Sequence, residues 1–139
     1  MAESGSPSAP RPAVPPASPG VTAVAVLSAW LVPGLGHVYL KRPLRGIAFF
    51  VLVVVAVIVG SRLQGNLYQP VQGQPLTLLA TAASMGMGFI YFLLRFALHY
   101  QGDLAGAGYE YGTAFLLTAG LMNLLLVLDA WDIVRGKKE

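Results

Sequence analysis

Two sets of polar side chains interrupt an otherwise apolar chain, and both contain the residue types that hold ions, protons or lipid head groups in membranes. When apolar helices run alternately up and down, the end of one helix shares a membrane face with the start of the next. This threading places one set together on one face, and we call it the predicted rim: His37, Tyr39, Lys41, Arg42, Arg45, Arg95, His99, Asp103 and Glu110. The second set, on the opposite face, comprises Arg62, Asp129, Asp132 and Arg135.

Asp129 and Asp132 are the unusual charges of the second set. They lie three residues apart on one helical face, near the C-terminal end of the last apolar segment, where the helix macrodipole disfavours anions. Arg135 follows Asp132 at i, i+3 spacing, and Arg62 ends a neighbouring segment at about the same expected depth. We therefore expect structural ion pairs that hold the second and fourth segments in register. A proton or ion site is the alternative.

Arg95 and His99 are one helical turn apart, so they project from one face of the third segment. Arg95 lies a turn or more inside the expected interface and needs a partner, for which Asp103 and Glu110 are the nearest candidates. The alternative is that this part of the rim binds an anionic lipid head group or a carboxylate of a partner protein.

The sequence lacks the local motifs of enzymes and cofactor proteins. It has no cysteine, which excludes disulfides, thiolate metal sites and cysteine nucleophiles. His37 and His99 lack the spacing of a metal-binding motif, and no serine has an adjacent histidine base. We therefore expect no enzyme activity, no metal and no cofactor. The basic residues sit at segment ends rather than along a stripe, so we expect contact with lipid head groups and no nucleic-acid binding.

The composition is that of a membrane protein. Hydrophobic residues make up 55% of the 139 residues and charged residues 11%. Sixteen uncharged residues separate Arg45 from Arg62, and eighteen separate Glu110 from Asp129. A helix rises about 1.5 Å per residue, so roughly 20 apolar residues cross a hydrocarbon layer of about 30 Å. Because backbone groups in lipid must pair within their own segment, we expect helices.

Proline and glycine divide the chain into its expected elements. We expect a disordered Pro/Ser/Ala-rich tail at 1–20, a membrane helical bundle at 21–134 with segments at about 21–40, 46–63, 76–100 and 112–134, and a charged tail at 135–139. The predicted fold class is all-α: a polytopic membrane protein of four transmembrane or partly re-entrant helices. The first helix is broken at Pro33–Gly36, because proline lacks the N–H that an interior helix needs and glycine permits a change of direction.

Two stretches resemble known families. The stretch GLGHVYLKRPLRG is similar to a signature at the first helix break of many small bacterial inner-membrane proteins, and more distantly to the two-transmembrane-helix domain family; Gly36, His37, Tyr39 and Gly46 carry the likeness. Its histidine-to-tyrosine spacing is one residue shorter than in that domain family, and Lys41 and Arg42 replace the usual glycine.

The end of the chain resembles an uncharacterised family of small four-helix bacterial inner-membrane proteins with a domain of unknown function. The residues that carry this likeness are Tyr109, Glu110, Tyr111, Gly112, Asn123, Asp129 and Asp132. The resemblance implies a multi-pass protein of the bacterial inner (cytoplasmic) membrane. It transfers no activity and no catalytic residue.

These features predict a small integral membrane protein that acts as a scaffold, an accessory subunit or an assembly factor. Its expected partners are membrane lipids, together with other membrane protein subunits or a second copy of the chain. The supporting feature is two interleaved pairs of small residues on the third segment, which let another helix approach closely: Ala82, Ser84, Gly86 and Gly88. The alternative function is handling of ions, protons or lipids through Asp129 and Asp132 or through Arg95 and His99.

The sequence leaves the membrane orientation open. Up-and-down threading puts the basic loop at 41–45 and the basic tail at 135–138 on opposite faces, so the positive-inside rule cannot hold for both. A first segment that is re-entrant moves the N-terminus to the other face and leaves this conflict in place.

Overall fold

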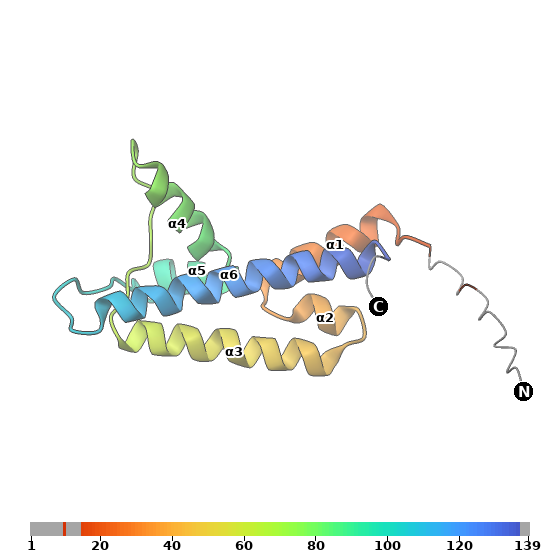
Figure 1. The fold of residues 1–139 in the computed structure, drawn as a ribbon, viewed down its shortest axis with the longest axis horizontal. Coiled ribbons are helices and arrows are strands. Elements are labelled where there is room, and N and C mark those ends of the chain that lie inside the picture. Colours follow the sequence, from red (N-terminus) through yellow and green to blue (C-terminus); the bar gives the residue numbers. More distant parts are fainter. Residues whose placement is uncertain (1–9, 11–14, 137–139) are drawn as a thin grey trace, which may run out of the picture.

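The computed structural model describes residue 10 and residues 15–136, and this part of the chain is all-α without strands. Its elements are α1 (Pro19–Leu31), α2 (Leu35–Tyr39), α3 (Pro43–Arg62), α4 (Pro75–Met85), α5 (Phe89–Phe92), the π-helical turn η1 (Leu93–Ala97) and α6 (Tyr109–Val134) (Figure 1). Most of the predicted tail at 1–20 and all but Arg135 and Gly136 of the predicted tail at 135–139 lie outside the described residues.

The long helices α3 and α6 lie side by side and run in opposite directions (Figure 1). Both are long and apolar enough to cross a membrane, with 20 and 26 residues. They approach closely near the end of α3, where a Cβ added to Gly60 would lie 2.9 Å from the carbonyl oxygen of Gly112. The start of α3 therefore lies beside the C-terminal half of α6.

The predicted first helix is two short helices that fold back on each other. α1 ends at Leu31, and α2 begins at Leu35 after a break that contains Pro33 and the left-handed Gly34, whose φ is +82°. Gly36 packs on α1 so tightly that an added Cβ would lie 3.0 Å from the carbonyl oxygen of Ala25. The chain thus enters along α6 and returns toward the same end, forming what we call the first hairpin (Figure 1).

The predicted third helix is also broken. α4 and the α5–η1 segment meet at a bend of 108°, and Gly88 at this bend has a φ of +65°. α4 projects away from the bundle (Figure 1). After η1, the hydroxyl of Tyr100 donates to the carbonyl of Gly65 over 2.8 Å, which returns the chain to the end of α3. We call α4, α5 and η1 the second hairpin. The described residues contain two candidate membrane spans, or three if the second hairpin is counted as one bent span.

The two hairpins meet at Asn123, in the middle of α6. The side-chain amide of Asn123 donates to the carbonyl oxygens of Trp30 at 2.9 Å and Gly86 at 2.7 Å, at the ends of α1 and α4. The indole N–H of Trp30 donates to the carbonyl of Met85 over 3.1 Å. Helix ends leave carbonyl groups without intrahelical partners, and in hydrocarbon each such group costs several kcal/mol. These side chains therefore stabilise helix ends inside the bundle.

The apolar core lies between α3, the second hairpin and α6. Its fully buried members come from all three: Val53 from α3, Met87 from the bend of the second hairpin, and Leu116 and Ala119 from α6. The bend supplies Met87 to this core. The bend of the second hairpin is therefore held both by apolar packing and by the hydrogen bonds of Asn123.

We expect Asn123→Ala to lower the free energy of unfolding by roughly 2–4 kcal/mol, because it leaves two buried carbonyl groups without a donor. The measurement is thermal unfolding of the purified protein in detergent, followed by circular dichroism. Leu121→Ala on the exposed face of α6 is the matched control. If the two variants unfolded at the same temperature, Asn123 would not be holding the helix ends.

Candidate functional site

The first hairpin and α6 are joined by a buried pair of titratable side chains. Nε2 of His37 on α2 lies 2.9 Å from Oδ2 of Asp129 on α6. The His37 side chain is fully buried, whereas Asp129 is 24% exposed. A carboxylate oxygen accepts a hydrogen bond, so Nε2 of His37 is the donor. Nδ1 of His37 has no hydrogen-bond partner among the described residues. This histidine thus holds α2 against α6 through one ring nitrogen.

The expected pairing of Asp129 and Asp132 with Arg62 is wrong. Gly60 lies against Gly112, so Arg62 is near the start of α6, and Asp129 is 17 residues further along that helix. At about 1.5 Å per residue this is a separation of roughly 25 Å. The cause is the second hairpin: because it returns to the end of α3 instead of crossing, α6 runs antiparallel to α3, and α3 begins rather than ends beside Asp129.

The expected pairing of Asp132 with Arg135 is also absent from the part of the chain that the structure describes. The guanidinium of Arg135 instead lies 5.3 Å from the centre of the Trp131 ring. This arrangement allows a cation–π attraction. Arg135 is therefore turned toward an aromatic ring rather than toward Asp132.

The structure divides the predicted rim between the two ends of the bundle. One part lies at the end where α6 finishes: His37, Tyr39, Lys41, Arg42 and Arg45. The other part lies at the end where α6 begins: Arg95, His99, Asp103 and Glu110. The single rim expected from up-and-down threading is therefore wrong, again because the second hairpin does not cross the bundle.

The second part of the rim makes local contacts. The guanidinium of Arg95 donates to the side-chain oxygen of Gln69 at 2.6 Å, rather than to Asp103 or Glu110. Asp103 accepts from the backbone N–H of Ala105 at 2.9 Å, which is a turn contact. These contacts fix the loops at this end. Arg95 and Gln69 also line a hollow of about 380 Å³ whose other walls include Phe92 and Phe96.

The tyrosine hydroxyl that anchors this end stays protonated at neutral pH. Burial, and to a smaller extent Tyr109, raises the pKa of the Tyr100 phenol above its ordinary value. The hydrogen bond from Tyr100 to Gly65 is therefore present across the physiological pH range.

A groove of about 890 Å³ lies between α3 and α6, at the end of the bundle that holds His37 and Asp129. We call it the α3–α6 groove, and its lining residues are Arg45, Ala48, Phe49, Leu52, Met122, Leu125, Leu126, Leu128, Asp129 and Asp132. Its volume is in the range of small-molecule sites. The charged residues stand at the mouth, near the start of α3 and the end of α6, and the apolar residues continue inward.

The sequence contains a signal for this groove that hydropathy does not reveal. On α3, Arg45, Phe49 and Leu52 recur at helical spacing, so they form one stripe. On α6, Asp132, Asp129 and Leu125 do the same in the reverse order. Two stripes with charge at one end and apolar residues behind it face each other only if the helices are antiparallel with these ends together.

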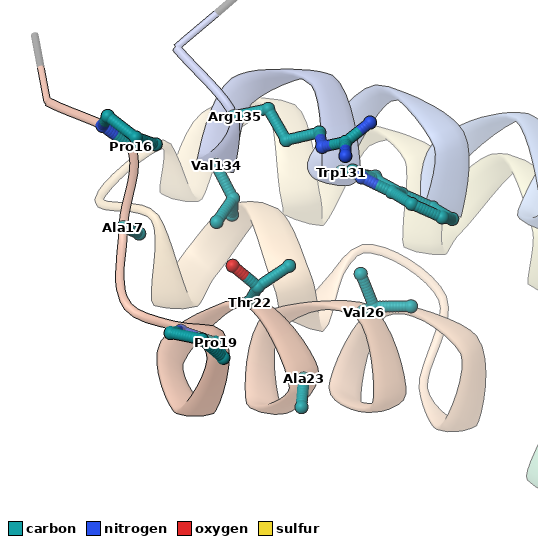
Figure 2. A pocket seen from close by; sticks show the side chains of 9 residues that line it. All are labelled: Pro16, Ala17, Pro19, Thr22, Ala23, Val26, Trp131, Val134 and Arg135. Carbon is teal, nitrogen blue, oxygen red and sulfur yellow. The ribbon is translucent and has the colours of Figure 1, made fainter.

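A smaller hollow of about 440 Å³ lies where α1 begins and α6 ends. Figure 2 shows Thr22 and Val26 of α1 on one side and Trp131 and Arg135 of α6 on the other. Of the described residues that line it, Arg135 is the one cation and none is a carboxylate. It therefore offers less polar chemistry than the α3–α6 groove.

Titratable side chains do not converge into a metal site in residue 10 and residues 15–136. No three of the His, Asp and Glu side chains described there come together. Buried zinc sites in proteins generally use three or four protein ligands, and the His37–Asp129 pair supplies two. We therefore treat this pair as a contact between helices.

Residues 24–139 match the family of unknown function DUF6677. The chain belongs to this family. The match begins within α1 and includes the first hairpin, Asn123 and the α3–α6 groove, so these features belong to the family region. It also confirms the expected membership of an uncharacterised family. No curated protein and no solved structure matches the chain.

We expect His37 and Asp129 to be energetically coupled. In a double-mutant cycle of His37→Ala and Asp129→Ala, the coupling energy should be about 1–3 kcal/mol, because the two side chains share a charge-assisted hydrogen bond away from water. The measurement is the free energy of unfolding of the single and double variants in detergent. Asp132→Ala, one turn further along α6, is the control and should be additive with His37→Ala. Additivity in both cycles would contradict the pairing.

Proposed function

We propose that this chain is a multi-pass inner-membrane protein of a bacterium that binds one membrane lipid in the α3–α6 groove. The observation that carries the proposal is the layout of the groove. Its mouth is charged, its interior is apolar, and its walls are the two described helices that are each long enough to cross a membrane. A phospholipid has the same layout, with a charged head group at the interface and an acyl chain parallel to the helices.

The proposed membrane arrangement has two spans and two re-entrant hairpins. α3 and α6 cross the membrane, and the first and second hairpins enter from opposite ends and meet at Asn123. The support is that the first hairpin starts at the end of the bundle where α6 finishes, and that the chain after the second hairpin returns to the end where α6 begins. The backbone N–H of Ala17 donates to Val134 before the first hairpin, and Tyr100 donates to Gly65 after the second.

This arrangement removes the conflict over orientation. With both hairpins re-entrant, the bundle end where α6 finishes carries Lys41, Arg42, Arg45 and Arg135, and the opposite end carries Arg62 and Arg95. The positive-inside rule then favours a cytoplasmic position for the first of these ends. The α3–α6 groove opens toward the cytoplasmic leaflet in this orientation.

A role as a scaffold, accessory subunit or assembly factor is the second candidate. Three of the four small residues of the third segment are used inside the chain: Ser84 and Gly88 are buried, and an added Cβ at Gly86 would lie 2.6 Å from the carbonyl oxygen of Gly120. The fourth, Ala82, is exposed. The observation that favours a partner is the projecting α4, on which Leu76 and Leu79 are 79% and 68% exposed. Co-purification that is lost on Leu79→Ser would support this role.

Single-cysteine labelling tests the membrane arrangement directly, because the natural chain has no cysteine. Lys41→Cys, Gln72→Cys and Leu104→Cys each place a thiol in a segment between helices. With two re-entrant hairpins, Gln72→Cys and Leu104→Cys react with an impermeant maleimide in intact cells, and Lys41→Cys reacts only after the membrane is opened. Four full spans would instead put positions 41 and 104 on one side and position 72 on the other.

Lipid retention tests the function. We expect the wild-type protein to keep one phospholipid through purification in mild detergent, as measured by native mass spectrometry. Ala48→Trp fills the groove and should reduce the retained lipid by about tenfold or more, since a bulky side chain occupies the volume of the acyl chain. Val51→Trp on the exposed face of α3 is the matched control. Equal retention by both variants would contradict binding in the groove.

A further inference from the structure

We infer that the α3–α6 groove selects a phospholipid whose head group carries both a phosphate and a primary amine. Arg45 and the start of α3 face the phosphate, and Asp132 at the end of α6 faces the ammonium. This inference rests on the proposed lipid-binding function and adds the class of head group. It follows from the charges and helix ends at the mouth of the groove.

The anion side of the mouth is the start of α3. Arg45 lines the groove and lies in the first turn of this helix. Backbone N–H groups in a first turn lack intrahelical acceptors, and the helix macrodipole is positive there. Within the described part of the chain, the side chain of Arg42 at the N-cap position makes no capping hydrogen bond. A phosphate beside Arg45 would meet a guanidinium and a positive helix end together.

The cation side of the mouth is the end of α6. Asp132 is half-buried, lines the groove and lies within the last turn of the helix, where the macrodipole is negative. A carboxylate in that place is doubly unfavourable unless a cation is near. Among the described residues Asp132 has no ion pair, and Arg135 is turned toward Trp131. An ammonium in the groove would supply the missing positive charge.

Asp129 also lies on the cation side of the mouth, and His37 holds its carboxylate in place. Its hydrogen bond to Nε2 of His37 fixes the carboxylate at the wall of the groove and keeps α2 against α6. Asp129 therefore adds negative potential at the mouth, and Asp132 is the carboxylate we assign to direct contact with the amine.

The antiparallel packing of α3 and α6 explains why both charges of a zwitterion fit one mouth. The positive end of one helix dipole lies beside the negative end of the other, and each carries a side chain of the matching sign. Behind the mouth, the apolar lining runs from Ala48 to Leu52 on α3 and from Leu128 back to Met122 on α6, which is about one to two helical turns. That length accommodates the first part of an acyl chain.

This chemistry discriminates between head groups. A primary ammonium donates hydrogen bonds to the carboxylate of Asp132, whereas the trimethylated nitrogen of a choline head group has no N–H to donate. A glycerol head group gives the phosphate without a cation, so it leaves Asp132 uncompensated. We therefore expect phosphatidylethanolamine to bind about tenfold more tightly than phosphatidylcholine or phosphatidylglycerol of the same acyl chains.

The experiment uses the full chain in detergent, delipidated and then titrated with each of these three lipids, with binding measured by native mass spectrometry. Asp132→Asn should lower the affinity for phosphatidylethanolamine to that for the other two lipids, and Asp132→Glu should restore most of the preference. Arg45→Gln should weaken all three lipids by a similar factor of about tenfold. Asp103→Asn, at the other end of the bundle, is the matched control and should change nothing.

The outcomes separate this inference from the proposed function. Equal binding of the three lipids that is still lost in Ala48→Trp would overturn the head-group inference and leave lipid binding in the groove standing. A preference that survives Asp132→Asn would overturn the assignment to Asp132. Lipid binding insensitive to Ala48→Trp would overturn the proposed function. Thermal unfolding of each variant shows that a loss of binding is not a loss of fold.

Discussion

The need to satisfy backbone carbonyl groups inside the bundle is the constraint on which the rest of this structure depends. Two helices, α1 and α4, end beside the middle of α6, where their terminal carbonyl groups lie inside the bundle without intrahelical donors. Asn123 donates to one carbonyl from each, and the indole of Trp30 donates to the neighbouring end of α4. Half-length segments are possible here because these side chains replace the missing backbone donors.

The direction of the chain after each break decides where every charged residue lies. Because the second hairpin turns back at the bend that contains Gly88, α6 begins beside the end of α3 and finishes beside its start. The start of one helix and the end of another then lie side by side, with Arg45 on one and Asp132 on the other. The α3–α6 groove and its charged mouth follow from this reversal rather than from a motif within either helix.

The His37–Asp129 contact links the hairpin to the groove. A fully buried imidazole needs a polar partner, and Asp129 needs compensation near a helix C-terminus, so each side chain meets the requirement of the other. Their contact holds α2 between α3 and α6. Gly34, at the start of α2, packs against Gly46 of α3. The α6 wall of the groove is therefore held at Asp129 by His37, which lies outside the groove.

Local features of the sequence determined the elements of this protein. Long apolar segments predict helices, and Pro33 and its neighbouring glycines predict the break in the first helix, because hydropathy and missing backbone donors act within a few residues. The stretch from Tyr109 onward also indicated the uncharacterised family.

Tertiary structure alone decided at which end of the bundle each polar residue lies. Whether a broken helix continues or reverses depends on contacts such as Gly36 on α1 and Asn123 on two helix ends, which join residues far apart in the chain. A single reversal separates Arg62 from Asp129 and brings His37 to it, and no local pattern encodes that outcome.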